Sequence, residues 1–274
     1  MIALWTKSKA RLQFVSENAG ENYNWLFLPG GPGLGSESLN DLIDILHLPG
    51  NIWKVDLPGD GSNNTEDDTQ YFSHWSQALI EAVSALPNVI LVAHSSGGMF
   101  ALATPALENI LTGLILMDSA PDASWQEFFT QYVKDHPLPE TEKLQQKYDI
   151  NPSNETLKQL TIACAPYFAT AASMQSIITL LKKLPFNYKT HVWAAHHFDN
   201  TYQAKWIPGI LPTLVFAGEY DYITPLNLFT ARDDFKRDNI TIKKISGGSH
   251  FPWYENPVEV KKMFDEFCQK LKLI

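Results

Sequence analysis

The segment Ala93-His94-Ser95-Ser96-Gly97 constrains the fold more than any other part of the chain. It follows an apolar run at residues 89–92, which predicts a buried parallel strand, and it precedes a helical pattern at residues 98–103. Small residues two positions before and after a serine fit a strand-to-helix turn too tight for larger side chains. Such a turn lifts the Ser95 hydroxyl out of the sheet and directs backbone N–H groups at the start of the helix towards it. The alternative is an ordinary loop between a strand and a helix.

The rest of the chain repeats this alternation of strand and helix. Apolar runs predict strands at residues 2–6, 11–15, 25–28, 52–56, 114–118, 213–217 and 240–245. Helical spacing predicts helices at residues 37–47, 71–86, 225–236 and 256–272. This order predicts an α/β fold with a mostly parallel central sheet flanked by helices.

One stretch departs from the pattern. Residues 122–205 carry helical and aromatic patterns broken by prolines, without a clear strand. We predict that residues 1–121 and 206–274 form the core, and that residues 122–205 form an inserted helical cap.

Composition restricts the partners. The formal net charge is −9 and no basic cluster is present, which argues against nucleic acid. The apolar runs are too short for a signal peptide or a membrane span, and the two cysteines lack metal-type spacing. We therefore expect a cytoplasmic monomer or homodimer that acts on a small-molecule substrate, with no membrane partner, no metal and no cofactor.

Chemically useful residues follow the predicted strands. A serine hydroxyl needs a base, and the base needs an orienting carboxylate. Asp221 comes just after the strand at 213–217, and His250 just after the strand at 240–245. The carboxyl ends of parallel strands share one edge of a sheet, so we predict Ser95 as nucleophile, His250 as base and Asp221 as acid. Glu219 and Asp118 are rival carboxylates.

A loop rich in glycine and proline, Pro29-Gly30-Gly31-Pro32-Gly33, follows another predicted strand. Its glycines allow the backbone to approach a ligand closely, although a plain turn is the simpler explanation. The spacing fits neither a dinucleotide fingerprint nor a phosphate-binding loop.

Together these motifs resemble the α/β-hydrolase fold, specifically serine hydrolases with a helical cap in the branch of proline iminopeptidases and esterases. The resemblance rests on Gly218-x-x-Asp221, on Gly248-x-His250 followed by Glu255-Asn256-Pro257, and on the loop at residues 29–33, which resembles the His-Gly-Gly-Pro-Gly loop of the iminopeptidases. It implies an oxyanion hole formed by the backbone N–H groups of Gly31 and Ser96.

The departures from the iminopeptidases favour another substrate. Pro29 replaces their leading histidine and Ser96 replaces the usual tryptophan, while His94 is more usual in esterases, lipases and carbon–carbon hydrolases. We therefore predict a serine hydrolase that cleaves small or medium, partly apolar esters. The alternatives are an iminopeptidase-like aminopeptidase, a carbon–carbon bond hydrolase, or a catalytically silent binding protein.

An aromatic-rich cap suggests an apolar acyl or alkyl group in the substrate. The candidate substrate-binding residues are His94, Trp125, Phe129, Phe168, His197 and Phe251. An aminopeptidase would also need a negative group in the cap, for which Glu127, Asp135 and Glu155 are available. His196, His197 and Asp199 could be read as metal ligands, but adjacent side chains point in different directions, which argues against one shared ion.

Overall fold

The computed structural model describes residues 2–64 and 71–272. Within this part of the chain, eight strands form one sheet in the order β1-β2-β4-β3-β5-β6-β7-β8. The strands are β1 (Ala3–Trp5), β2 (Arg11–Asn18), β3 (Asn24–Leu28), β4 (Gly50–Asp56), β5 (Val89–His94), β6 (Leu111–Met117), β7 (Thr213–Gly218) and β8 (Ile240–Ile245). Each strand predicted from the sequence is present.

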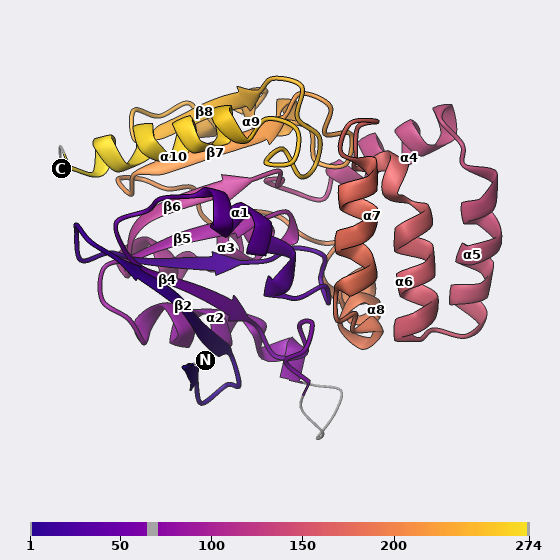
Figure 1. Cartoon of the computed structure of the whole chain (residues 1–274), viewed down its shortest axis with the longest axis horizontal. Helices are drawn as coiled ribbons and strands as arrows, with labels where there is room; N and C mark the ends of the chain where they lie inside the picture. Colours follow the sequence, from indigo (N-terminus) through magenta and orange to yellow (C-terminus); the bar gives the residue numbers. More distant parts are fainter. Residues whose placement is uncertain (1, 65–70, 273–274) are drawn as a thin grey trace.

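The sheet is mostly parallel, as predicted. β1 pairs with β2 and β2 pairs with β4 in antiparallel register, whereas every pair from β4 to β8 is parallel. The carboxyl ends of the parallel strands therefore meet at one edge of the sheet, which faces the inserted helices (Figure 1).

Two layers of helices cover the sheet, because side chains of a strand alternate between its faces. On β5, Leu91 and Ala93 pack in one apolar cluster with α2 (Trp75–Ser84) and α3 (Ser96–Leu102). Ile90 and Val92 pack in a second cluster with α1 (Asn40–Ile45) and α10 (Pro257–Leu271). The central strands are thus buried on both faces, which explains their continuous apolar sequences.

The helix predicted at residues 225–236 is not continuous. The structure has a short helix, α9 (Asn227–Thr230), followed by a 3₁₀ turn at Asp233–Phe235. Phe229 and Phe235 are both buried, with ring centroids 4.9 Å apart. Six residues of α-helix would rotate them about 240° relative to each other, so an unbroken helix could not bring the two rings into contact.

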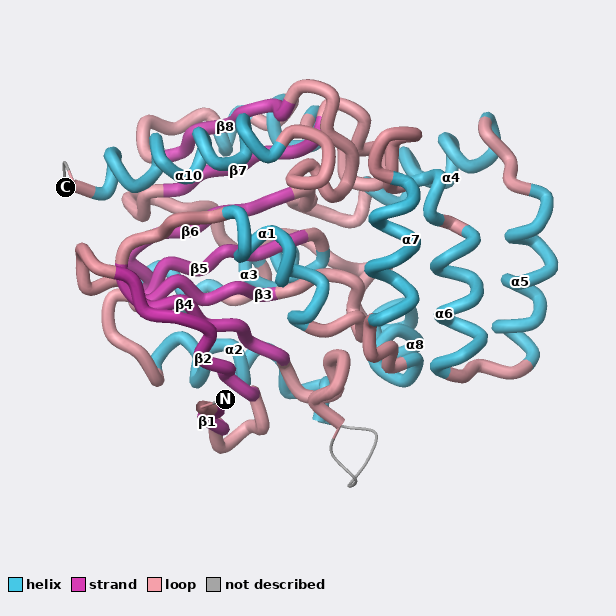
Figure 2. The backbone as a smooth tube through the Cα atoms, viewed as in Figure 1, coloured by secondary structure: helices cyan, strands magenta, loops and turns pink. Residues whose placement is uncertain are grey.

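The insertion consists of α4 (Trp125–Asp135), α5 (Pro139–Ile150), α6 (Asn154–Ala163), α7 (Met174–Lys183) and α8 (Tyr188–His197), which lie beyond the carboxyl edge of the sheet (Figures 1 and 2). Its two ends lie side by side, since Asp122 and Gln203 form an antiparallel bridge. The insertion contacts the core directly: the backbone N–H of Asn187 donates to the carbonyl of Gly33 over 2.8 Å, and the Thr190 hydroxyl donates to the carbonyl of Gly59 over 2.6 Å.

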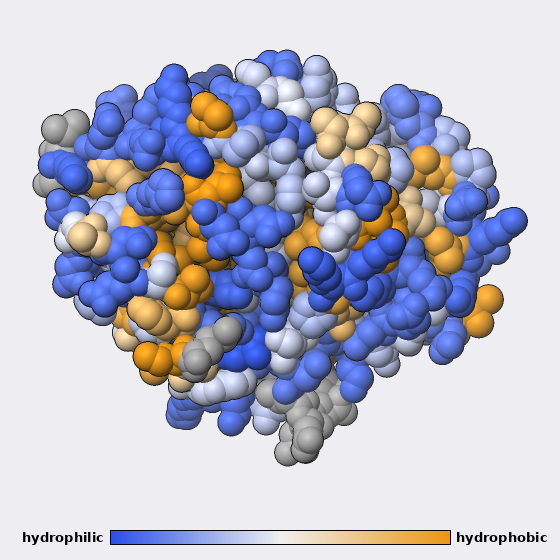
Figure 3. All heavy atoms as spheres, in the orientation of Figure 1, coloured by the Kyte–Doolittle hydropathy of each residue, from blue (hydrophilic) through white to orange (hydrophobic). Residues whose placement is uncertain are grey.

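The face of the molecule in Figure 3 is mostly hydrophilic, with apolar side chains in separate groups. Of the helices in residues 2–64 and 71–272, none combines the length and the apolar character needed to cross a membrane.

Candidate active site

Ser95 lies on the sharp turn between β5 and α3. Its φ of 52° and ψ of −125° are strained for a residue with a side chain. Two hydrogen bonds hold this conformation: the Ser95 N–H donates to the carbonyl of Met117 over 2.9 Å, and the Ser119 hydroxyl donates to the carbonyl of Ser95 over 2.8 Å. A Cβ atom at Gly97 would lie 2.4 Å from the carbonyl oxygen of Pro29, so a small residue is required there.

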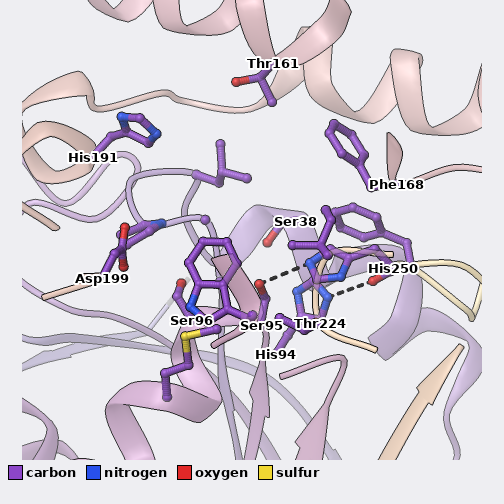
Figure 4. A pocket seen from close by; sticks show the side chains of 18 of the residues that line it. Ser38, His94, Ser95, Ser96, Thr161, Phe168, His191, Asp199, Thr224 and His250 are labelled. Atoms are coloured by element: carbon purple, nitrogen blue, oxygen red, sulfur yellow. Dashed lines mark hydrogen bonds between the residues drawn. The ribbon is translucent and has the colours of Figure 1, made fainter. Parts of the chain in front are cut away.

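The structure brings Ser95, His250 and Asp221 into one chain of hydrogen bonds. Nε2 of His250 lies 3.1 Å from Oγ of Ser95, as the dashed line in Figure 4 shows. Nδ1 of the same ring lies 3.0 Å from Oδ2 of Asp221. With the proton on Nδ1, the ring donates to the carboxylate and its Nε2 accepts from the serine hydroxyl.

Asp221 is buried, and its surroundings favour the ionised form. Burial alone would raise the pKa of its carboxyl, but the His250 ring and hydrogen bonds from Thr224 outweigh burial and lower the pKa below its ordinary value of 3.8. Oδ1 accepts the N–H groups of Ile223 and Thr224, and Oδ2 accepts the Thr224 hydroxyl. Asp221 therefore presents a fixed negative charge to the imidazole at neutral pH.

The rival carboxylates have other partners. Glu219 pairs with Lys244 over 2.8 Å at the surface. Asp118 is fully buried at the end of β6, where one oxygen accepts the Gly218 N–H over 2.8 Å. Burial and the nearby charge of Asp221 raise the pKa of Asp118 well above its ordinary value, which favours its protonated form.

Asp118, Asp221 and His250 have ligand-type atoms within 4.8 Å of one another. The Nδ1–H of His250 is engaged with Asp221, and the raised pKa of Asp118 makes that carboxyl a weaker cation ligand. The donor set therefore suits proton transfer better than metal binding.

His94 supports His250 from beside it. Its Nε2–H donates to the backbone carbonyl of His250 over 2.9 Å, and the two ring centroids are 4.9 Å apart. Burial is the main cause that lowers the pKa of His94 to about 3, so the ring stays neutral. His94 lines the cavity, but its bonded nitrogen holds the loop of His250 in place.

The loop predicted to supply an oxyanion donor lies against the serine. A Cβ atom at Gly30 would lie 2.5 Å from Cβ of Ser95. Gly31 and Ser96 both line the cavity, and neither backbone N–H donates to an acceptor within the described part of the chain. Backbone N–H groups that have no acceptor and line the cavity at Ser95 can act as donors to an oxyanion.

A cavity of about 200 Å³ opens at Ser95, between the core and the insertion. Of the predicted substrate-binding residues, His94, Trp125, Phe168 and Phe251 line it. The sequence prediction missed several other lining residues: Met99, Thr161, His191, Asp199 and Ile223. These come from distant parts of the chain and share no local motif.

Phe129 and His197, also predicted to contact substrate, are not among the residues that line this cavity. The Phe129 ring packs edge-on against Tyr167, with centroids 5.7 Å apart. His197 is exposed at the end of α8, where its ring lies beside Trp193. Both side chains lie on helix faces that are turned away from the cavity. Which face of a helix is turned towards the cavity depends on how the helices of the insertion pack together.

Comparisons with known proteins agree with this architecture. A model of the alpha/beta hydrolase family matches residues 25–262. No curated protein sequence resembles the chain significantly.

Among solved structures, an esterase from Thermogutta terrifontis is similar, with 18% identity, a TM-score of 0.69 and 98% of each chain covered. A proline iminopeptidase-related protein from Thermus thermophilus has 17% identity and a TM-score of 0.73, with 98% of this chain and 96% of that chain covered. An epoxide hydrolase from Bacillus megaterium has 16% identity and a TM-score of 0.67, with 98% and 100% covered. At these identities the likeness concerns the fold.

Proposed function

The chain belongs to the alpha/beta hydrolase family, and from that premise we propose that it is a serine hydrolase that cleaves small or medium, partly apolar esters through an acyl-enzyme. The observation that carries the proposal is the continuous hydrogen-bonded chain from Ser95 through His250 to Asp221, with Ser95 and His250 lining the cavity.

In the first half of the reaction, Nε2 of His250 takes the hydroxyl proton as Oγ of Ser95 attacks the ester carbonyl carbon. Asp221 stabilises the imidazolium that forms. The carbonyl oxygen becomes negatively charged and accepts the N–H groups of Gly31 and Ser96, each contributing on the order of 3 kcal/mol to lowering the barrier. His250 then gives its proton to the departing alkoxide, which leaves as the alcohol.

In the second half, a water molecule attacks the acyl-enzyme while His250 accepts one of its protons. The tetrahedral intermediate collapses, Ser95 regains its proton from His250, and the carboxylic acid leaves. The site needs no further reactant for this cycle.

The cavity supports the choice of substrate class. Trp125, Phe168 and Phe251 contribute aromatic rings, and a volume of about 200 Å³ suits a short acyl group.

The proposal is tested by labelling the purified protein with a fluorophosphonate probe and by assaying p-nitrophenyl esters of graded length. We expect an adduct on Ser95, and hydrolysis that decreases about 10⁴-fold or more in Ser95→Ala and in His250→Ala, both with unchanged circular dichroism. Adduct formation on Ser95→Ala, or activity retained in both variants, would contradict the assignment.

A further inference from the structure

The cavity contains one carboxylate that the proposed mechanism does not use. Asp199 follows α8 and lines the cavity wall together with His191 from the same helix (Figure 4). Among the residues that the structure describes, neither oxygen of the Asp199 carboxylate takes part in a hydrogen bond or an ion pair.

Within residues 2–64 and 71–272, no positive group pairs with the Asp199 carboxylate. His191 is neutral, because burial lowers its pKa, and its Nδ1 lies 3.0 Å from the Tyr148 hydroxyl. The cavity lining includes neither lysine nor arginine. Burial raises the pKa of Asp199 to about 6, so at neutral pH most molecules hold an unpaired negative charge in the cavity.

A partly buried, unpaired carboxylate is costly unless a cation joins it. The cavity lining supplies no such cation, so a cationic group on the substrate would fill this role. We propose that Asp199 binds a protonated amine on the substrate, so that the cavity selects esters of short amino-substituted carboxylic acids. This inference rests on the proposed ester hydrolysis and names its substrate class.

The geometry of the reaction places the amine on the acyl side. His250 must protonate the leaving alcohol, so the alcohol part of the ester lies on the side of His250. In Figure 4, His250 and Asp199 lie on opposite sides of Ser95. The acyl group, directed away from His250, therefore extends towards Asp199. An ammonium group offers N–H donors to both carboxylate oxygens and a full charge.

The test uses pairs of methyl esters in which an ammonium group replaces a terminal methyl group. Glycine, β-alanine and 4-aminobutyrate methyl esters are compared with methyl propionate, butyrate and pentanoate, and acid release is followed by titration at constant pH. At the best-fitting length, we expect wild-type kcat/KM to be about tenfold or more higher for the amino ester than for its alkyl partner. In Asp199→Asn this ratio is expected to decrease about tenfold or more.

Asp135→Asn is the matched control. It removes the same charge from an exposed position on α4, outside the residues that line the cavity. We expect the control to keep the wild-type ratio. If Asp199→Asn and Asp135→Asn have the same ratio at every chain length, the proposal is wrong.

A binding measurement separates this inference from the proposed function. Saturation-transfer NMR with n-butylammonium and with 1-butanol reports occupancy without turnover. We expect a stronger n-butylammonium signal with the wild type than with Asp199→Asn, and similar 1-butanol signals. If neither ester series is cleaved but this difference is seen, ester hydrolysis is wrong and Asp199 is still a cation site. Cleavage of the alkyl esters together with equal n-butylammonium signals refutes the cation site alone.

Discussion

A single methyl group at Gly30 tests how tightly the glycine-rich loop is fitted to the nucleophile. The Cβ of Gly30→Ala would lie 2.5 Å from Cβ of Ser95, 2.8 Å from the carbonyl oxygen of His94 and 3.2 Å from Oγ of Ser95. Two carbon atoms in contact need about 3.5 Å or more, so the loop and Ser95 must separate by about 1 Å. The φ of Gly30 lies outside the left-handed region, so alanine adds no backbone strain of that kind.

A shift of that size acts on both parts of the proposed site. The Ser95–His250 distance is already 3.1 Å, and the adjoining Gly31 N–H is a proposed oxyanion donor. Misplacement by 1 Å costs about 10²-fold in rate, and loss of one oxyanion donor costs about 10²–10³-fold. We expect kcat/KM of Gly30→Ala on p-nitrophenyl acetate to fall about 10²–10³-fold, with about 1–3 kcal/mol lost from the free energy of unfolding through overpacking.

The control is Gly209→Ala, where the nearest atom to the new Cβ is Oε1 of Glu108 at 3.4 Å and the φ is also outside the left-handed region. We expect wild-type rates from this variant. Urea unfolding of both variants separates a local effect from loss of the fold. A folded Gly30→Ala protein with kcat/KM within about threefold of wild type would refute the reasoning, because the loop would then have room to spare.

Three further predictions concern other carboxyl groups of the core. Asp221→Asn should lower kcat/KM about 10³–10⁴-fold. Asp118→Asn should change kcat/KM by less than about tenfold, because Asp118 bonds to the Gly218 N–H and not to His250. Equal losses in the two variants would mean that both acids orient His250. Glu255 accepts the Ser249 hydroxyl over 2.6 Å and the Ser249 N–H over 3.2 Å, so Glu255→Ala should cost about 2–4 kcal/mol in urea unfolding, and a loss below about 0.5 kcal/mol would contradict this. Burial is the main cause that raises the pKa of Asp60 from 3.8 to about 8. The folded state therefore binds the Asp60 proton more tightly than the unfolded state. The contribution of this proton to the free energy of unfolding is complete below pH 3.8 and is lost as the pH rises through 8. Asp60→Asn should flatten that part of the curve of unfolding free energy against pH, and an unchanged curve would show that Asp60 is ionised in the folded protein.

The strands were predictable because the central sheet is buried on both faces. A strand such as β5 then has an apolar residue at every position before His94, a signal that needs no knowledge of its neighbours. The positions of Ser95, Asp221 and His250 were predictable for a related reason, since each follows a parallel strand and such strands end at one edge.

The cavity wall was less predictable, because it depends on how the insertion packs on the core. In the sequence, Asp199 is distinguished only by its two neighbouring histidines. Its place opposite His250 follows from contacts such as that between Asn187 and Gly33. A Cβ at Gly33 would lie 2.4 Å from the carbonyl oxygen of Asn187, so the core and the insertion are in close contact there. Phe129 has an aromatic side chain like those of Trp125 and Phe168, yet packing directs it elsewhere.

The residues proposed to carry out catalysis and the residue proposed to select the substrate therefore lie in different parts of the molecule, the core and the insertion. Ser95 and His250 are fixed by strands of the core, whereas Asp199 is carried by the insertion. Glu255 joins the core and the insertion. Its carboxylate accepts a hydrogen bond from the hydroxyl of Ser249, next to His250, and another from the hydroxyl of Ser173, just before α7. Substitutions on the insertion should then change which ester is cleaved while leaving the chain from Ser95 to Asp221 intact. Substitutions of Glu255 should affect both, since the same carboxylate orients the catalytic loop and holds the insertion over it.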